Sequence, residues 1–219
     1  MRDTLYVQYG AGWSAPEGWV SFDSSPTLWL ERLPVVGRLV RVNSQRFPEA
    51  TRFGDIVKGL PVADGSARAV YASHVLEHLS RNDVEIALAN TLRILEPGGV
   101  FRLIVPDLQA RARRYLVRAE ANDTGAADDF MMETMLGLRA RPRTLLGRLR
   151  SLIGNSDHLW MYDEAAMCAL MEKVGFAGVR RCDLGDASEA AFSRVEAADR
   201  FKDMSLGCRE VAIEGRRAD

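Results

Sequence analysis

The pattern of hydrophobic residues along the chain predicts several short strands. The segments 5–9 and 19–22 are rich in β-branched and aromatic residues and are separated by a loop of Gly, Ala, Ser and Pro, which is typical of two strands and a turn. The segments 67–72 (ARAVYA) and 100–105 (VFRLIV) are almost continuously apolar, and the second is interrupted only by Arg102. Such runs are expected of parallel strands that are buried on both faces of a sheet.

A helix is predicted between the two buried strands. Its apolar residues follow helical spacing from Val84 to Leu95, Asn82 or Asp83 can cap its start, and the sequence at 97–99 (PGG) can end it. Strand, helix and strand in this order predict neighbouring parallel strands joined by a right-handed crossover. Repetition of that unit implies an open α/β sheet.

The pattern changes after Asp107. The segment from about 109 to 158 is mostly helical in character, rich in Arg and Met, and is interpreted as a helical insertion. Beyond it, Asp163 can cap a helix that runs to Val174 and ends at Gly175. Strands are predicted at 176–183 and at about 208–214. With no repeat and no linker, we expect one domain over 1–219.

Composition narrows the classes of function. The 29 Lys and Arg residues nearly balance the 30 Asp and Glu residues, giving a net charge of −1, so we expect no nucleic-acid partner. No apolar stretch approaches the roughly 20 residues that span a bilayer, and the first residues do not resemble a secretion signal. Three unpatterned cysteines suit a reducing compartment. We therefore expect a cytoplasmic protein without a membrane span.

The most specific motifs occupy the middle of the chain. They are GDIVKGLPVADGSARAVYASHVLEHLS at 54–80 and NTLRILEPGGVFRLIVPDL at 90–108. In this order they resemble class I S-adenosylmethionine-dependent methyltransferases, and most closely the small bacterial methyltransferase-domain (type 11-like) proteins. The resemblance implies a Rossmann-like, doubly wound, mostly parallel seven-stranded sheet with an antiparallel last strand and a helical cap inserted at about 109–158.

The resemblance also implies a cofactor site for S-adenosylmethionine. Glycines in the loop after the first strand let the backbone approach the methionine part of the cofactor. An aspartate at the end of the second strand accepts hydrogen bonds from the ribose. A further aspartate and an apolar neighbour face the adenine, and the tip of the next strand lies near the sulfonium. The residues at these positions are Tyr9, Gly10, Gly12, Asp23, Asp55, Ile56, Ser73 and His74.

Three residues are candidates for catalysis. Methyl transfer depends mainly on proximity and alignment, and a hydroxyl acceptor also benefits from a base. His74 is the first candidate for that base and His158 the second, with Asp107 as an orienting carboxylate. The sequence thus predicts methyl transfer to an oxygen, or a nitrogen, of a small molecule such as a sugar or secondary metabolite.

The sequence HVLEH at 74–78 also matches the H-x-x-E-H pattern of inverted zinc peptidases. In those proteins the two histidines share one face of a long helix. Here the motif directly follows a predicted strand, and the helix begins only after it. We therefore expect no metal, and expect His78 to be a hydrogen-bonded polar residue beneath the site.

The insertion offers an acceptor-binding surface. An Arg-rich run without acidic residues favours either a solvated helix face or recognition of an anionic acceptor, because guanidinium groups bind anions in a forked geometry. A basic segment resting on an anionic membrane is a further interpretation. The Met and Leu residues nearby are expected to form helix core. The arginines are Arg139, Arg141, Arg143, Arg148 and Arg150, and the apolar residues are Met131, Met132, Met135, Leu136 and Leu138.

Two alternatives remain at this point. Gln8 and Tyr9 stand where the family's first motif includes a glycine, and about nine residues between the first two strands leave no room for the usual helix. A methyltransferase-fold domain that has lost its cofactor and serves as a binding module is therefore the competing hypothesis. A nicotinamide-dependent oxidoreductase is disfavoured, since Ala15 replaces the third glycine of G-x-G-x-x-G and Pro16 follows it.

Overall fold

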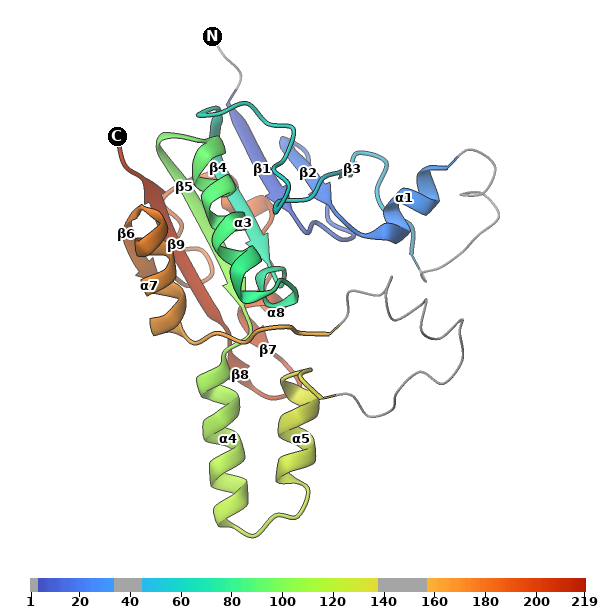
Figure 1. Cartoon of the computed structure of the whole chain (residues 1–219), viewed down its shortest axis with the longest axis vertical. Helices are drawn as coiled ribbons and strands as arrows, with labels where there is room; N and C mark the ends of the chain where they lie inside the picture. Colours follow the sequence, from blue (N-terminus) through green and yellow to red (C-terminus); the bar gives the residue numbers. More distant parts are fainter. Residues whose placement is uncertain (1–3, 34–44, 138–156) are drawn as a thin grey trace.

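The computed structural model describes residues 4–33, 45–137 and 157–219, which build a seven-stranded sheet with helices on both sides (Figure 1). The sheet order is β3-β2-β1-β4-β5-β9-β6, and β9 runs antiparallel to both of its neighbours. The predicted fold class, a mostly parallel Rossmann-like sheet with an antiparallel last strand, is confirmed. The strands are β1 (Leu5–Tyr9), β2 (Trp19–Asp23), β3 (Arg52–Phe53), β4 (Ala67–Ser73), β5 (Leu95–Val105), β6 (Phe176–Arg181) and β9 (Val211–Arg217).

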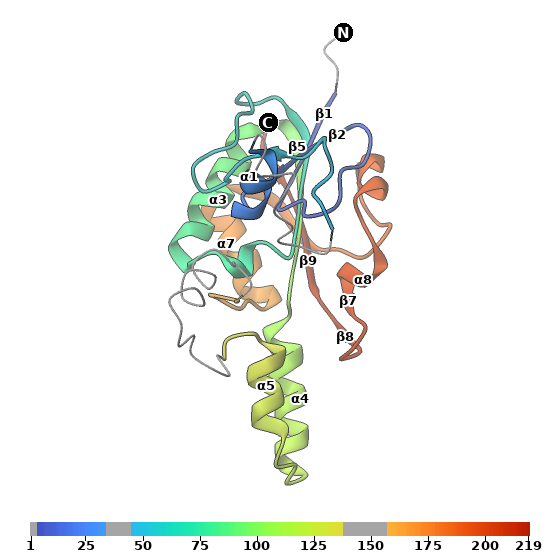
Figure 2. The same ribbon diagram turned by 90° about the vertical axis from the view of Figure 1, so that its right-hand side faces the viewer.

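The two faces of the sheet are covered by different parts of the chain (Figure 2). The helices α3 (Arg81–Ile94) and α7 (Glu164–Val174) pack on one face over the larger apolar core. The short helices η2 (Ala190–Arg194) and α8 (Ala198–Phe201) lie on the other face, over a smaller core. A small hairpin of β7 (Lys202–Asp203) and β8 (Cys208–Arg209) follows α8.

Residues 10–18, between β1 and β2, form only turns and no helix, as their number predicts. The carboxyl-terminal part of the chain covers the adjacent face instead. The indole Nε1 of Trp19 donates a hydrogen bond to the Ala191 carbonyl at 3.2 Å, and the Arg194 guanidinium donates one to the Glu17 carbonyl at 3.0 Å. The helix that is missing between β1 and β2 is therefore replaced on this face of the sheet by η2.

Helix α3 begins earlier than predicted. Its cap is Ser80, not Asn82 or Asp83: the Ser80 hydroxyl accepts the Asp83 N–H at 3.3 Å and lies 2.6 Å from the Asp83 carboxylate. The first bond satisfies a helix N–H group that would otherwise lack a partner, and in the second the Ser80 hydroxyl donates to the Asp83 carboxylate. The helix ends at Ile94, so β5 starts before the PGG sequence.

The predicted boundaries of α7 are confirmed. The Asp163 carboxylate accepts the Ala166 N–H at 2.8 Å, and Gly175 ends the helix at φ 113°. This left-handed conformation favours glycine because it has no Cβ.

The described part of the insertion is a helical hairpin that projects away from the sheet (Figure 1). It consists of α4 (Leu108–Glu120) and α5 (Ala126–Glu133). The prediction that its methionines form core is wrong, because Met131, Met132 and Met135 expose 43%, 45% and 41% of their surface, and Leu136 exposes 45%. Leu138 and the arginines of the 139–150 run lie outside the described residues. Among the described helices, none is long and apolar enough to cross a membrane.

Candidate active site

The carboxyl ends of β1, β2, β3 and β4 meet at one edge of the sheet, where an α/β protein binds its ligands. The loop after β1 is joined to the end of β2 by two backbone donors: Ala11 N–H donates to the Phe22 carbonyl at 3.0 Å and Gly12 N–H to the Asp23 carboxylate at 2.8 Å. Gly54, after β3, donates to the Asp23 carbonyl at 3.1 Å. The structure thus brings Gly10, Gly12, Asp23 and Asp55 into one region.

Asp23 is a buried carboxylate at the end of β2, only 8% exposed. One of its oxygens accepts the Gly12 N–H and the other accepts the Ser25 N–H, both at 2.8 Å. A carboxylate offers about four acceptor positions, so these two bonds fix its orientation and leave others free. Its chemistry fits the two hydroxyls of a ribose.

Asp55 lies just beyond β3. One oxygen accepts the Val57 N–H at 2.9 Å and the other lies 3.4 Å from the Lys58 ammonium, while a quarter of the side chain stays exposed. Its neighbour Ile56 is 5% exposed and belongs to the larger core. The carboxylate is accessible to a ligand amine, whereas little of Ile56 is left to contact an adenine ring.

The two side chains before the glycine loop have different surroundings. Tyr9 is 2% exposed and lies in the larger core, where its hydroxyl accepts a hydrogen bond from the Thr91 hydroxyl at 3.2 Å. The Gln8 amide donates to the Ser14 carbonyl in the loop at 2.9 Å and to the Ser21 hydroxyl at 2.7 Å. The Tyr9 side chain is therefore a core residue with little surface left for a ligand, and the Gln8 side chain is bonded to the loop.

The two loop glycines both have left-handed backbones, but for different structural reasons. Gly10 has φ 62°, and a Cβ there would lie 2.1 Å from Cγ2 of Val75, which follows β4. Gly12 has φ 53°, and a Cβ there would meet nothing within 4 Å. Gly10 therefore permits the close packing of two strand ends, and Gly12 leaves open space at the loop.

This difference predicts unequal costs for two otherwise identical substitutions. Gly12→Ala should lower the free energy of unfolding by about 1–2 kcal/mol, because only backbone strain is added. Gly10→Ala should cost a further ~1–3 kcal/mol, because the new methyl group overlaps Val75. Urea denaturation of the two variants measures both values, and Val75→Ala combined with Gly10→Ala should recover part of the extra loss. Equal losses for the two glycines would refute the packing role of Gly10.

His74 stands at the tip of β4 in a left-handed conformation, with φ 54°. Its Nε2 lies 3.3 Å from the Arg200 carbonyl and its Nδ1 3.5 Å from the Glu77 carboxylate. Burial opposes protonation of the ring, but the Glu77 carboxylate outweighs this and raises the pKa of His74. Before it in the chain, the Ser73 hydroxyl is buried and has no hydrogen-bond partner in the part of the chain that the structure describes.

The structure does not join His158 to Asp107. Asp107 caps α4 by accepting the N–H groups of Gln109 and Ala110 at 2.8 and 3.2 Å. His158 is buried, its Nδ1 lies 2.8 Å from the Thr134 carbonyl, and burial lowers its pKa. Among the contacts of the described residues, none links the Asp107 carboxylate to a histidine, and its orienting role stays a prediction.

Glu77 and His78, which the sequence analysis did not propose as metal ligands, lie beside these histidines. The Glu77 side chain is buried, and the Nε2 of His78 lies 4.0 Å from its Oε1. The H-x-x-E-H pattern was the feature of the sequence that could have indicated a role for these two residues. It was considered only as a helical motif, whereas the chain forms a single 3-10 turn, η1 (Leu76–His78), at this point.

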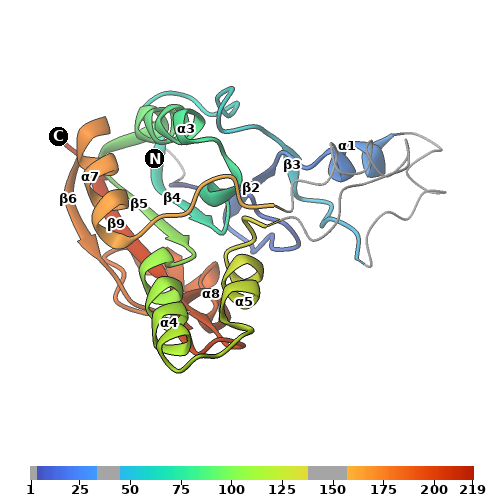
Figure 3. The ribbon, with the colours of Figure 1, turned by 60° about the horizontal axis from the view of Figure 1, so that its bottom comes forward.

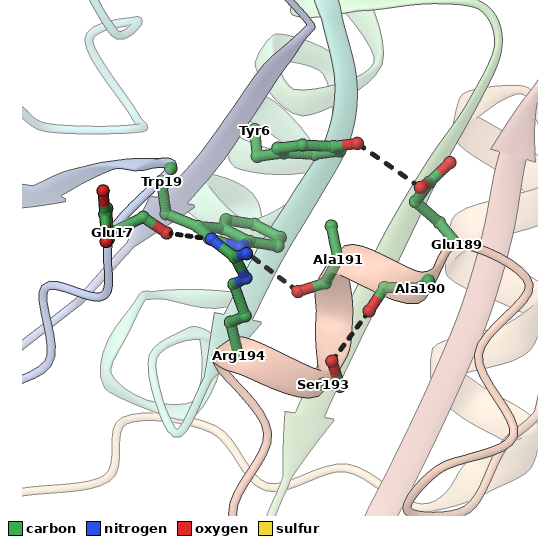
Figure 4. A pocket seen from close by; sticks show the side chains of 9 residues that line it. Tyr6, Glu17, Trp19, Glu189, Ala190, Ala191, Ser193 and Arg194 are labelled. Carbon is green, nitrogen blue, oxygen red and sulfur yellow. Dashed lines mark hydrogen bonds between the residues drawn. The ribbon is translucent and has the colours of Figure 1, made fainter.

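A pocket of about 410 Å³ opens elsewhere, between the first two strands and η2 (Figure 4). Tyr6 and Trp19 in its wall belong to the amino-terminal parts of β1 and β2, away from the strand ends that carry Asp23. Its side chains bond to one another, as Tyr6 does to Glu189 at 3.4 Å. This pocket is therefore separate from the candidate active site.

Comparison with known proteins identifies the family. The model of a family described as a methyltransferase domain matches residues 16–180, so the chain belongs to that family. This membership agrees with the resemblance to methyltransferases that the motifs carry. No curated protein matches the sequence.

Solved structures share the fold at low sequence identity. A SAM-dependent methyltransferase from Methanosarcina mazei is 12% identical with a TM-score of 0.52, and the match covers 100% of this chain and 94% of that one. A SAM-dependent methyltransferase from Archaeoglobus fulgidus is 11% identical with a TM-score of 0.51, over 98% of this chain and 86% of that one. At such identities the likeness concerns the fold.

Proposed function

We propose that the protein transfers a methyl group from S-adenosylmethionine to an oxygen, or a nitrogen, of a small molecule. The observation that carries this proposal is the Asp23 carboxylate, held by Gly12 and Ser25 at the end of β2 with acceptor positions free. S-adenosylmethionine supplies an activated methyl group, so the protein's own contribution is mainly to align the two reactants.

The residues at the strand ends divide the binding of the cofactor among them. Asp23 accepts hydrogen bonds from the ribose hydroxyls, and Asp55 accepts one from the adenine amine, while Gly12 leaves room at the loop for the methionine part. The Ser73 hydroxyl, which has no hydrogen-bond partner among the described residues, could bond a ligand at the end of β4.

The acceptor is proposed to approach from the side of the insertion. The α4–α5 hairpin lies beyond the carboxyl end of β5 (Figure 3). It carries exposed methionines, which adapt to apolar surfaces. A hydroxyl acceptor, which can be anionic, is favoured over an amine because His74 stands at the tip of β4. The base role of His74 remains a prediction, since its Nε2 first has to leave the Arg200 carbonyl.

Calorimetric titration with S-adenosylmethionine tests the proposal, with S-adenosylhomocysteine alongside and NAD as the control. We expect micromolar binding of the first two and no heat with NAD, because the loop lacks the third glycine of a dinucleotide motif. Binding would justify a screen of hydroxylated acceptors. Absence of binding would favour the alternative, a domain that keeps the fold and acts as a binding module.

A further inference from the structure

All three histidines of the chain converge on one buried carboxylate. The Glu77 Oε1 lies 3.5 Å from Nδ1 of His74 and 4.0 Å from Nε2 of His78. The rings of His78 and His158 lie edge to face, with their centroids 5.0 Å apart. One ligand atom from each of Glu77, His78 and His158 lies within 4.8 Å of the others. These spacings leave room for an ion among them.

The Glu77 carboxylate has no hydrogen-bond partner among the described residues. Its side chain is 1% exposed, and neither of its oxygens is bonded. Both histidine nitrogens near it are farther away than the 2.7–3.2 Å typical of a hydrogen bond. An unpaired charge at such a depth is strongly unfavourable, so this carboxylate requires a cation or a proton.

The two histidines present the correct nitrogen for a metal. Nδ1 of His78 lies 3.1 Å from the Asp157 carbonyl, and Nδ1 of His158 lies 2.8 Å from the Thr134 carbonyl. A carbonyl can only accept, so each Nδ1 carries the proton and each Nε2 of the neutral ring carries a lone pair. Metal-ligating histidines are oriented in this way by a carbonyl on the opposite nitrogen.

The backbone holds the two halves of the cluster together. Leu159 N–H donates to the Glu77 carbonyl at 2.7 Å, and Trp160 N–H donates to the same oxygen at 3.2 Å. His158 N–H donates to the Met135 carbonyl at 3.3 Å. The segment that carries His158 is thereby hydrogen-bonded to the turn of Glu77, so the three ligands are arranged before any ion arrives.

We propose that Glu77, His78 and His158 bind a divalent transition-metal ion. Imidazole and carboxylate ligands suit ions such as Zn²⁺, and three protein ligands leave at least one coordination position for water or an acceptor oxygen. This arrangement differs from the helical H-x-x-E-H motif, because His74 lies outside the three-ligand group. As a ligand, His158 no longer serves as a base.

The site does not depend on the proposed methyl donor. None of its three ligands is among the residues proposed to hold S-adenosylmethionine. Zn²⁺ binding and S-adenosylmethionine binding are therefore measured separately on the same protein, and failure of one leaves the other standing.

Calorimetric titration with Zn²⁺ tests the proposal on the full chain, prepared without a histidine tag and freed of metal by a chelator. We expect one ion per chain. Glu77→Gln and His158→Gln should each weaken binding by about tenfold or more, on the scale of losses seen when metal-site residues are replaced. Co²⁺ should give a visible absorption band with the wild type that Glu77→Gln lacks.

Two matched controls sharpen the test. His74→Asn replaces the neighbouring histidine by asparagine, a residue type that tolerates the positive φ at this position. It should leave the affinity for Zn²⁺ unchanged. Cys208→Ser should also leave it unchanged, which excludes binding to the Cys208 thiol. Thermal unfolding adds a readout independent of activity: Zn²⁺ should raise the Tm of the wild type more than that of Glu77→Gln.

Three results would overturn the site. They are no Zn²⁺ binding by the wild type, equal binding by Glu77→Gln, or a loss in His74→Asn as large as that in His158→Gln. In each case the cluster would instead be an ion pair between Glu77 and a protonated histidine. Glu77→Gln keeps the shape of the side chain and removes an unpaired buried charge, so the metal-free variant should fold at least as stably as the wild type.

Discussion

Arg102→Met should lower the free energy of unfolding by about 3–5 kcal/mol, the scale of removing one partner of a buried ion pair. Arg102 lies in the middle of β5 and is fully buried. Its guanidinium is 2.9 Å from Glu214, 2.7 Å from Glu196 and 3.0 Å from Asp186. The Glu196 and Glu214 side chains are themselves buried, so the substitution removes the ion-pair partner of Glu196 and leaves Glu214 paired with Arg180 alone.

The loss should depend on pH in a definite direction. Burial already raises the pKa of Glu196, and the nearby Arg102 partly opposes this. Without the guanidinium, the pKa of Glu196 rises further above its value in the unfolded chain. Stability that depends on its protonated form is present at low pH and lost as the pH rises through the folded pKa. The destabilisation should therefore be smaller at pH 5 than at pH 7.

Chemical denaturation of Arg102→Met and Arg180→Met provides a matched comparison. Arg180 pairs with two of the same acids, Glu214 and Asp186, but its side chain is 41% exposed. Its substitution should cost only about 0–1 kcal/mol, as expected of a surface pair. Adding Glu214→Gln to Arg102→Met should restore part of the stability. A loss below that of Arg180→Met would contradict the role assigned to Arg102.

The elements that were predicted best are those whose signals are local. The segment 5–9 is a strand with the predicted ends, and α7 has the predicted cap and stop, Asp163 and Gly175. For α3 the cap was misplaced, because Ser80 and Asp83 are both good capping residues and are bonded to each other. Local chemistry identifies such a cap only to within a turn.

Interactions between distant segments could not be predicted from the pattern of hydrophobic and polar residues. Arg102 appeared as one interruption in an apolar strand, which indicates a buried charge, but nothing nearby points to residues 186, 196 and 214 as its partners. Arg111 is likewise buried, with Glu210 at 2.9 Å, and nothing near it in the sequence points to that partner. Such partners are set by the path of the chain after the insertion.

In the candidate active site, too, the parts set by local sequence were predicted and the contacts between distant segments were not. The strand ends that carry Asp23, Asp55 and Ser73 follow from the predicted order of strands and helices, because parallel strands end at one edge. The proximity of His158 to Glu77 does not follow from that order, since it depends on how the chain returns from the insertion. The motif at 74–78 was therefore considered without its third ligand.

Asp23→Ala should weaken the binding of S-adenosylmethionine by about 1–3 kcal/mol, roughly 5- to 150-fold, the scale of losing hydrogen bonds to a charged group. Part of this loss is direct, because the ribose hydroxyls lose their acceptor. Part is indirect, because Gly12 N–H and Ser25 N–H lose theirs and the loop after β1 is no longer held at the end of β2.

Asp23→Asn separates the two contributions. The amide keeps one oxygen that can still accept the Gly12 or the Ser25 N–H, but it loses the charge and one acceptor oxygen. Its affinity for S-adenosylmethionine should therefore lie between those of the wild type and Asp23→Ala. Asp186→Asn is a suitable control, since this carboxylate binds Arg102 and Arg180 on a different part of the sheet and should leave the affinity unchanged. If Asp23→Ala binds S-adenosylmethionine as tightly as the wild type does, Asp23 only ties the loop to β2, and the ribose is held by other residues.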